Sequence, residues 1–587
     1  MIKPFIERAR NGDNVFLCDV RDAFACAQTT IECEVKPVGY PARRYSIALP
    51  CWENEEEAKF VKEYFFAQIY NMISALGGEK ITLYIPPDED KAADLLSTLD
   101  DVFQINAFRL QRSGYGKCLN VTDRVNSAMG VPPFRFEIVR GFSQTPISAE
   151  TANRRDALDS FRKAAGTATN IATFGMDIGG TDIKMVVAKD GRIVALKEYD
   201  WYPSQLTTIE SMVSTILLLT RVMRMALSLP ETDTANRIRV ALLDKDASDA
   251  DMAATLKIAE AEFGTPELFD AIGVCFPDVV IKNKIVGGET DKMRKIRESS
   301  ADFEKELSEI YNLEAMLLEH CKSGGVVRIA NDGSIAAYTA AVELAHSEHA
   351  YAIADGVFAH SLGTDFGTGW IDGAGEIPQI PLEVYNSIID LGDYPAKNHS
   401  VFDLRNNGNF NTGLNGALQK YAGQFGAYRL AMRIFEKDAP ELYKQLFDMG
   451  FIEEKDNMIS VVSFPEDMRK ALLQHIIDLA DNGAPAAQRI FREIGKYLAA
   501  TWRETEFILS PDTKSRILYG RFIKRQKCFD LMQEGAGELL GPYFIAGDDN
   551  LAYTPLMQQL KDDLKYTVAH FGQAVGAIHY AASAIAQ

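Results

Sequence analysis

Cysteine is scarce in this chain. Only 8 cysteines occur among 587 residues, which is too few for a disulfide scaffold. No two of them are separated by two residues, the spacing typical of zinc-binding loops. Five fall within the first 118 residues: Cys18, Cys26, Cys33, Cys51 and Cys118. The sequence therefore predicts buried thiols rather than disulfides or a zinc centre.

The chain also lacks an apolar segment that would direct it to a membrane. Residues 1–8 contain no apolar core of the kind that a secretory signal has. The best membrane candidate, residues 211–229, is interrupted by Arg221 and Arg224, so we expect an amphipathic helix there. These features predict a cytoplasmic protein without a membrane partner.

Positive charge is in deficit. The chain has 62 Lys and Arg against 82 Asp and Glu, a formal net charge of −20 at pH 7. This excess of negative charge argues against nucleic acid as a partner. A phosphorylated small molecule can still bind, because its site needs only backbone N–H groups, one or two cations and a metal. A hydrophobic content of 47% describes a globular protein, and its length predicts two or three cores.

Residues 1–170 are predicted to form a separate mixed α/β domain without a chemical constellation. We expect strands over residues 14–20, 29–35, 45–49 and 80–85. Residues 55–76 should form a helix, because apolar residues recur there at spacings of three and four. The small residues 165–170 are predicted to be a linker.

The most informative stretch surrounds two adjacent glycines, Gly179 and Gly180. Apolar-rich runs flank them at residues 171–176 and 183–188, and Asp190-Gly191 precedes a third β-prone run. Asp-Gly between such runs is a strong hairpin signal. The expected order is therefore strand, Gly-Gly turn, strand, Asp-Gly turn, strand. This order fits neither a dinucleotide fingerprint, whose glycines lead into a helix, nor a P-loop.

Such a turn suits phosphate binding, because glycines bring successive backbone N–H groups close to a ligand. Thr181 would add a hydroxyl and Lys184 a positive charge. Asp177 would hold Mg²⁺ through its water shell, since hard cations prefer oxygen ligands. For this stretch alone, a tight β-turn with a solvated Asp177 and a solvent-facing Lys184 explains the residues equally well.

A second glycine cluster at residues 360–373 repeats the order of strand, glycine turn, strand and Asp-Gly turn. This repetition predicts a duplicated half-domain, in which one hairpin from each half contacts the same ligand. Between the two clusters, a predicted strand over residues 324–330 delivers Asn331 and Asp332 to the start of a helix. The charged stretch 292–311 is predicted to be a solvated helix or flap.

Four short motifs then follow one another in a recognisable order. They are Asp-Ile-Gly-Gly-Thr at 177–181, Gly-Val-x-x-Pro at 273–277, Asn-Asp-Gly-Ser-x-Ala-Ala at 331–337 and Leu-Gly-Thr-x-x-Gly-x-Gly at 362–369. In this order they resemble the motifs of ROK-type sugar kinases, which belong to the actin-like and hexokinase-like ATPase superfamily. The resemblance covers roughly residues 172–586.

The resemblance implies an α/β protein with the two-lobed, ribonuclease H-like ATPase fold, preceded by an additional N-terminal mixed α/β domain. The expected bounds are 1–170 for the N-terminal domain, 171–345 for the first lobe and 346–587 for the second lobe. The first lobe would carry one phosphate loop and the catalytic Asp. The second would carry the other phosphate loop and the adenosine site.

The resemblance also implies roles for individual residues. Asp332 would be the general base that takes a proton from the attacking hydroxyl, and Asn331 would bind a neighbouring hydroxyl. Asp177 would hold Mg²⁺. The residues predicted to bind ATP are Gly179, Gly180, Thr181, Lys184, Gly363, Thr364, Gly367, Gly369, Gly520 and Gly576. Outside this motif order, Asp332 would be interpreted as a helix cap, because Asp is favoured near helix N-termini.

The acceptor side departs from the family pattern. Glu383 and Asn386 stand, by counting from Asp372, where the family has its Glu-x-Gly-His sugar motif. They are the predicted substrate-binding residues, although a solvated loop would explain them equally well. No cysteine occurs between Cys321 and Cys528, so the family's zinc segment is absent.

The nucleotide side departs from the pattern too. Asp182 adds a negative charge near the first phosphate loop, and Gly520-Arg521-Phe522 replaces the usual three glycines near the adenine. Sugar and adenine recognition are therefore expected to be altered, while the two phosphate loops are intact.

The predicted function is ATP- and Mg²⁺-dependent phosphorylation of a hydroxyl group on a sugar or sugar-like molecule. The altered motifs favour an alternative, a non-catalytic sugar or nucleotide sensor that keeps the fold. A transcriptional repressor, as some ROK relatives are, is disfavoured because no basic DNA-reading helix is evident. The sequence leaves open the substrate and assembly into a homo-oligomer, and we hypothesise that the N-terminal domain regulates access or assembly.

Overall fold

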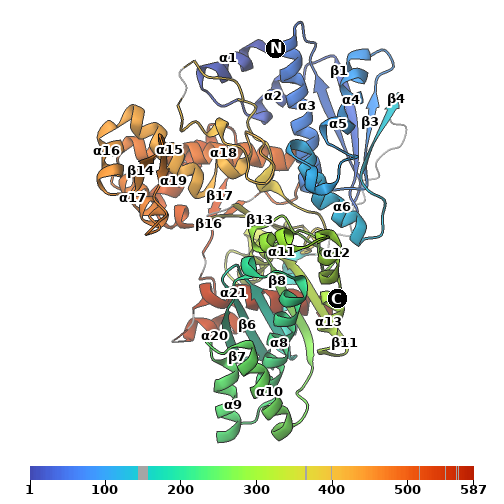
Figure 1. The fold of residues 1–587 in the computed structure, drawn as a ribbon, viewed down its shortest axis with the longest axis vertical. Coiled ribbons are helices and arrows are strands. Elements are labelled where there is room, and N and C mark those ends of the chain that lie inside the picture. The colour runs from blue at the N-terminus through green and yellow to red at the C-terminus, as the bar shows by residue number, and fades with distance from the viewer. Residues whose placement is uncertain are drawn as a thin grey trace.

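The computed structural model describes residues 1–142, 156–363, 366–397, 400–514, 516–541, 543–548, 550–563, 565 and 567–586. Figure 1 shows an N-terminal domain at the top of the view and a first lobe at the bottom, with the sheet of a second lobe between them.

The N-terminal domain is built on a four-stranded sheet in the order β2-β1-β3-β4. Strand β1 pairs antiparallel with β2 and β3, and β3 pairs parallel with β4. The elements are α1 (Lys3–Asn11), α2 (Leu17–Phe24), β1 (Thr29–Lys36), β2 (Arg43–Leu49), α3 (Glu55–Leu76), β3 (Lys80–Ile85), α4 (Asp90–Ser97), α5 (Leu99–Val102), α6 (Cys118–Ala128) and β4 (Arg135–Arg140). The strand predicted over residues 14–20 is wrong. Helix α2 begins there, because Leu17, Val20 and Phe24 recur at helical spacing and are buried.

The first lobe carries a five-stranded sheet in the order β11-β8-β5-β6-β7. Its elements are α7 (Ala157–Ala168), β5 (Thr173–Ile178), β6 (Asp182–Lys189), β7 (Arg192–Asp200), α8 (Ile209–Ser228), α9 (Asp233–Leu243), α10 (Asp249–Phe263), β8 (Phe269–Phe276), β9 (Val280–Ile281), β10 (Lys284–Ile285), α11 (Arg294–Ser299), α12 (Phe303–Leu307), α13 (Leu313–Leu318), β11 (Cys321–Asn331) and α14 (Asp332–Ala345). The predicted order of strands and turns is confirmed. Asp190 has φ of 50° and Gly191 has φ of 73°, the two positive angles that a type I′ hairpin turn requires.

Helix α8 is the one described helix that is long and apolar enough to cross a membrane by length and composition. Of its most apolar window, 61% is buried inside the protein. Met212, Ile216, Leu219 and Met223 belong to the core of the first lobe, which explains the apolar composition without a membrane.

The second lobe carries a four-stranded sheet in the order β13-β12-β16-β17. Its elements are β12 (Val357–Leu362), β13 (Phe366–Ile371), α15 (Gly423–Asp438), α16 (Pro440–Asp448), β14 (Ile452–Lys455), β15 (Met458–Val461), α17 (Arg469–Asp481), α18 (Pro485–Leu509), β16 (Arg516–Gly520), α19 (Gln526–Gly537), β17 (Phe544–Ala546), α20 (Pro555–Asp562) and α21 (Val568–Ala586).

The two lobes share one strand order. In the first lobe, β5 pairs antiparallel with β6 and parallel with β8, which pairs parallel with β11. In the second, β12 pairs antiparallel with β13 and parallel with β16, which pairs parallel with β17. This repeat confirms the expected α/β class and two-lobed, actin-like fold, with an additional domain at the N-terminus.

Two helices cross between the lobes. Helix α14 follows the last strand of the first lobe and packs on β12 and β13 of the second. Helix α21 ends the chain and packs on β5, β6 and β8 of the first lobe, against α14 and α7. The sequence prediction groups α21 with the second lobe and treats residues 165–170 as a linker, whereas α7 occupies much of that segment as a packed helix. The domain bounds remain a prediction.

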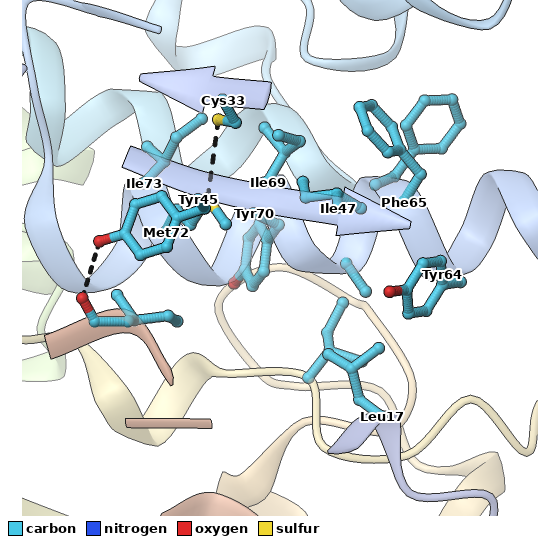
Figure 2. Close-up of a cluster of buried hydrophobic side chains, with 14 of the residues drawn as sticks. Leu17, Cys33, Tyr45, Ile47, Tyr64, Phe65, Ile69, Tyr70, Met72 and Ile73 are labelled. Atoms are coloured by element: carbon cyan, nitrogen blue, oxygen red, sulfur yellow. Dashed lines mark hydrogen bonds between the residues drawn. The ribbon is translucent and has the colours of Figure 1, made fainter. Parts of the chain in front are cut away.

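The N-terminal domain shares its core with the second lobe. Phe358 on β12, Trp370 on β13 and Trp502 on α18 belong to the same buried cluster as the side chains of the N-terminal sheet and α3. Figure 2 shows part of this cluster, in which the Tyr45 hydroxyl donates a hydrogen bond to the Ile508 carbonyl at 2.7 Å. The N-terminal domain is therefore anchored to the second lobe by apolar packing.

Tyr45→Phe is expected to lower the free energy of unfolding by about 1 kcal/mol, because the Ile508 carbonyl loses a buried hydrogen bond while the ring packing is kept. Denaturant titration followed by fluorescence measures this change. Tyr84→Phe is the matched control, since the half-buried Tyr84 hydroxyl has no hydrogen-bond partner among the described residues. Equal midpoints for the two variants would contradict the anchoring role of this bond.

Candidate functional site

A cavity of about 720 Å³ lies between the two lobes. Asp177 and Lys184 line it from the first hairpin, and Phe366, Gly367 and Thr368 line it from the second. The start of α14 and the loop at residues 377–385 complete the acceptor end. The structure thus brings strand residues of both predicted hairpins and the predicted base to one cavity, whose size suits a small-molecule site. The turn residues Gly179, Gly180 and Thr181 of the first hairpin, and Gly363 of the second, are absent from the described lining of this cavity.

The first hairpin places its polar residues at the cavity edge. Asp177 on β5 stands opposite Lys184 on β6 in the strand register. The turn between them is closed by the Gly179 N–H, which donates to the Asp182 carbonyl at 2.8 Å. Lys184 donates to the Asp182 carboxylate, so Asp182, the departure noted in the sequence, partly neutralises this lysine. Thr181 is exposed at the turn.

Asn331 and Asp332 divide two roles at the start of α14. The Asn331 side chain accepts from the Gly333 N–H at 2.9 Å and donates to the Asp278 carbonyl at 3.0 Å. Asn331 is therefore the N-cap of the helix. Asp332 also accepts from the Gly333 N–H, at 2.8 Å, and its side chain lines the cavity. Burial raises the pKa of the Asp332 carboxyl, and the nearby Lys292 opposes that rise.

Three carboxylates meet at one edge of the first-lobe sheet. Asp177 lies at the end of β5, Asp278 just after β8 and Asp332 just after β11. Parallel strands present their carboxyl ends at the same edge, which accounts for the grouping. Burial raises the pKa of Asp177 and of Asp278 to about 6 each. A buried carboxylate in a cleft with such a shift is typical of a functional site.

Sequence reasoning missed Asp278 and Lys292. Asp278 accepts from the N–H groups of Val279 at 2.8 Å and Gly288 at 2.7 Å, and both Asp278 and Lys292 line the cavity. The signal for Asp278 was available, since it follows a buried strand in the same way as Asp332. Lys292 had no such signal, because a lysine in a charged stretch usually lies in solvent.

The predicted acceptor residues form a hydrogen-bonded set. Asn386 donates to the Glu383 carboxylate at 3.1 Å and accepts from Asn409 at 2.9 Å. Glu383 lines the large cavity, whereas the buried Asn386 lines a small adjoining pocket. Burial raises the pKa of Glu383 to about 8, and the negative charge of Asp278 adds to the rise. Asn386 thus orients Glu383 toward the cavity.

The remaining predicted glycines fall into two groups. Gly367 lines the cavity, Gly363 lies at the second turn, and Thr364 lies outside the described residues. A Cβ on Gly369 would lie 2.1 Å from the Gly333 carbonyl oxygen, and one on Gly520 would lie 2.3 Å from the Leu362 carbonyl oxygen. A Cβ on Gly576 would lie 1.7 Å from Thr339 Oγ1. These last three glycines are close-packing positions and are absent from the described lining of the cavity.

The other end of the cavity is lined by residues of α14, α20 and α21 and of the loop before α20. Apolar and polar side chains both line it: Ala340, Leu551, Met557 and Val568, with Thr339, Glu343, Asp548 and Gln573. Gly572 of α21 also lines this end.

Within the parts of the chain that the structure describes, no three His, Cys, Asp or Glu side chains are grouped as metal ligands. Mg²⁺ does not need such a group, because it keeps several waters and binds through one or two carboxylates plus phosphate oxygens. Asp177 and Asp332 face the same cavity and interact electrostatically. The carboxylate of Asp177 therefore fits the predicted role of holding Mg²⁺ through its water shell.

Glu383→Gln is expected to stabilise the ligand-free protein at high pH. Folding raises the pKa of Glu383 from 4.5 to about 8, so the wild-type carboxyl loses stability as the pH rises through that window. Glu383 is only half-buried and lines the cavity, so solvent screening limits the expected gain at pH 8 to about 1–2 kcal/mol. The gain should vanish near pH 4.5.

Thermal unfolding of both proteins between pH 4.5 and 8 measures this difference. Glu348→Gln, which changes an exposed side chain, should show no such pH-dependent gain. If the midpoint of thermal unfolding changed with pH in the same way for Glu383→Gln and wild type, the burial of this carboxyl would be contradicted.

No protein-family model matches the chain, and no curated protein matches it. Solved structures do. A ROK family glucokinase from Streptomyces griseus, in complex with glucose and AMPPNP, is 18% identical with a TM-score of 0.37, and the match covers 70% of this chain and 99% of that one. A ROK hexokinase from Thermus thermophilus is 16% identical with a TM-score of 0.36, covering 69% and 97%. A putative N-acetylmannosamine kinase from Listeria monocytogenes is 12% identical with a TM-score of 0.36, covering 70% and 99%. Two of these three structures are described as ROK family sugar kinases, the family whose motifs the four sequence motifs resemble.

Proposed function

We propose that this protein is an ATP- and Mg²⁺-dependent kinase that phosphorylates a hydroxyl group of a sugar or sugar-like molecule. The proposal rests on one observation: residues of both hairpins and Asp332 line a single cavity between the lobes. Phosphoryl transfer asks mainly for positioning and charge neutralisation. This arrangement supports the positioning, and the proposed Mg²⁺ would supply much of the neutralisation.

Each end of the cavity has its own task in this proposal. Asp332 takes the proton of the attacking hydroxyl, and Asn331 and Glu383 hold neighbouring hydroxyls of the acceptor. The phosphate side would use Gly179, Gly180, Thr181 and Lys184 from the first hairpin, and Gly363, Thr364 and Gly367 from the second. Gly369, Gly520 and Gly576 would shape the nucleotide site through close packing. Asp177 would hold Mg²⁺, which supplies neutralisation of phosphate charge when bound.

The organisation follows from the same proposal. An N-terminal domain, a first lobe and a second lobe would enclose a small-molecule site, and closure of the lobes would exclude water. We place the protein in the cytoplasm without a membrane or nucleic-acid partner, because the one described helix that is long and apolar enough to cross a membrane belongs to the core of the first lobe and the net charge is −20.

An ADP-release assay with Mg²⁺ and ATP over a panel of sugars and polyols tests the proposal. We expect at least one acceptor to raise ADP release far above the rate without acceptor, and that increase to depend on Asp332. Nucleotide binding without acceptor-dependent turnover across the panel would favour the sensor instead.

A further inference from the structure

Residues 287–304 of the first lobe, which we call the flap, contribute Thr290 and Lys292 to the lining of the cavity. The flap begins where Asp278 holds the Gly288 N–H. A Cβ on Gly287 would lie 1.5 Å from the Asp278 carboxylate, so only glycine allows this approach. Arg297 donates to the Thr290 carbonyl at 2.7 Å and also to the Gly288 carbonyl. The flap is therefore tied to the edge of the sheet that carries the carboxylates.

Lys292 reaches from the flap into the space between the first hairpin and Asp332. Its Cε lies 3.3 Å from the position that a Cβ on Gly180 would take. It lines the cavity beside Asp278 and Asp332, and its charge acts on both carboxyl groups. No hydrogen bond or ion pair of its ammonium group is found among the described residues.

An unpaired ammonium group beside a glycine turn is a place for an anion. The other charged groups that face it are carboxylates, which repel a phosphate, while Lys184 is already paired with Asp182. Lys292 is thus the cation of this region that remains available to a ligand.

We infer that Lys292 is a catalytic residue that binds the transferred phosphoryl group, and that helix α6 of the N-terminal domain positions it through the flap. The inference rests on the proposed kinase function. In the step, the acceptor oxygen forms a bond to the γ-phosphorus and the bond from that phosphorus to the β,γ-bridging oxygen breaks. Asp332 receives the hydroxyl proton, ADP leaves, and Lys292 offsets the negative charge on the phosphoryl oxygens.

Helix α6 holds the flap on both sides of Lys292. The side chain of Arg124 is 1% exposed and forms ion pairs with Glu289 at 2.9 Å and Glu304 at 2.8 Å. Lys117 adds a second pair to Glu289 at 3.4 Å, and Asn120 donates to the same carboxylate at 3.3 Å. Because these charges are largely withdrawn from water, their geometry is more constraining than that of a surface pair.

Apolar packing supports the same contact. Val121 and Val125 of α6 form one buried cluster with Val279, Ile281 and Val286, which lead into the flap. The rest of the N-terminal domain is anchored in the core of the second lobe. The domain therefore links the second lobe to the flap of the first, which gives a positioning role to a domain that carries no chemistry of its own.

Nucleotide binding tests the role of Lys292 without any acceptor. Lys292→Ala should weaken AMPPNP about tenfold in calorimetry with Mg²⁺ and leave ADP affinity unchanged, because only AMPPNP carries the third phosphate. Lys295→Ala, on the exposed side of α11 in the same flap, should change neither. Equal effects on the two nucleotides, or no effect, would overturn the inference.

A double-variant comparison tests the positioning role of α6. Glu289→Gln should weaken AMPPNP about threefold relative to ADP in the wild-type background and have no such effect in Lys292→Ala. Lys36→Met, which breaks an ion pair within the N-terminal domain alone, is the control. A Glu289→Gln effect that persists without Lys292 would show that Glu289 does not act through it.

The outcomes separate this inference from the kinase proposal. One outcome is that the protein binds AMPPNP more tightly than ADP, that this difference depends on Lys292, and that no acceptor raises turnover. This outcome would support a phosphate-binding role for Lys292 and overturn the kinase proposal. Turnover that depends on Asp332 but not on Lys292 would uphold the kinase alone. A wild-type protein that binds neither nucleotide would overturn both.

Discussion

Asp332→Asn is expected to lower the turnover of the acceptor by about 10²-fold or more, the contribution of a positioned general base. The amide cannot take the hydroxyl proton. Its oxygen can still accept from the Gly333 N–H, and Asn331 continues to cap α14. The fold and the affinity for ATP should therefore be retained.

The coupled ADP-release assay gives kcat, and calorimetry gives the affinity for ATP. Asp190→Asn is a matched control, because Asp190 lies in a type I′ turn with φ of 50°, a conformation that Asn adopts readily. The pH dependence adds a second readout. Burial raises the pKa of Asp332, so wild-type activity should fall on the acid side as this base is protonated. Equal rates for Asp332→Asn and wild type would remove Asp332 from the mechanism.

Gly369→Ala is expected to lower the free energy of unfolding by about 3 kcal/mol, the upper range for overpacking a buried site. The new Cβ would lie 2.1 Å from the backbone oxygen of Gly333 and 2.7 Å from the Ala337 Cβ. A backbone oxygen at the start of α14 cannot rotate away. Strand β13 and α14 must therefore separate, which also moves Asp332 relative to the second hairpin.

Gly367→Ala is the matched control, because it changes the same strand two residues away. The nearest atom to its new Cβ is the Ser361 Cβ at 3.5 Å, an ordinary contact. Stability should stay within about 0.5 kcal/mol of wild type, while nucleotide affinity falls because the methyl group projects at the cavity. Denaturant unfolding and calorimetry measure the two effects. Equal destabilisation of the two variants would contradict the close packing at Gly369.

Local patterns were sufficient for the parts of the fold that short-range chemistry controls. Asp190-Gly191 predicts a hairpin because few other residue pairs adopt two positive φ angles at low cost. The repeated glycine clusters predict two related sheets. The strand predicted from the short apolar run at residues 14–20 was wrong, because the spacing of apolar residues in so short a run does not distinguish a strand from the start of a buried helix.

By itself, the sequence determined the order of the motifs, the two-lobed fold and the positions of Asp177 and Asp332 at strand ends, because these depend on neighbours along the chain. Only the tertiary structure decided which glycines line the cavity and which pack against a backbone. Gly367 and Gly369 are alike in sequence and differ only in what packs against them. The tertiary structure also decided the position of Lys292. Its stretch of sequence is charged and was predicted to be solvated, yet Lys292 lines the cavity with Asp332. Long-range packing sets these positions, and the residues that pack against a side chain from distant parts of the chain cannot be identified from the local sequence pattern.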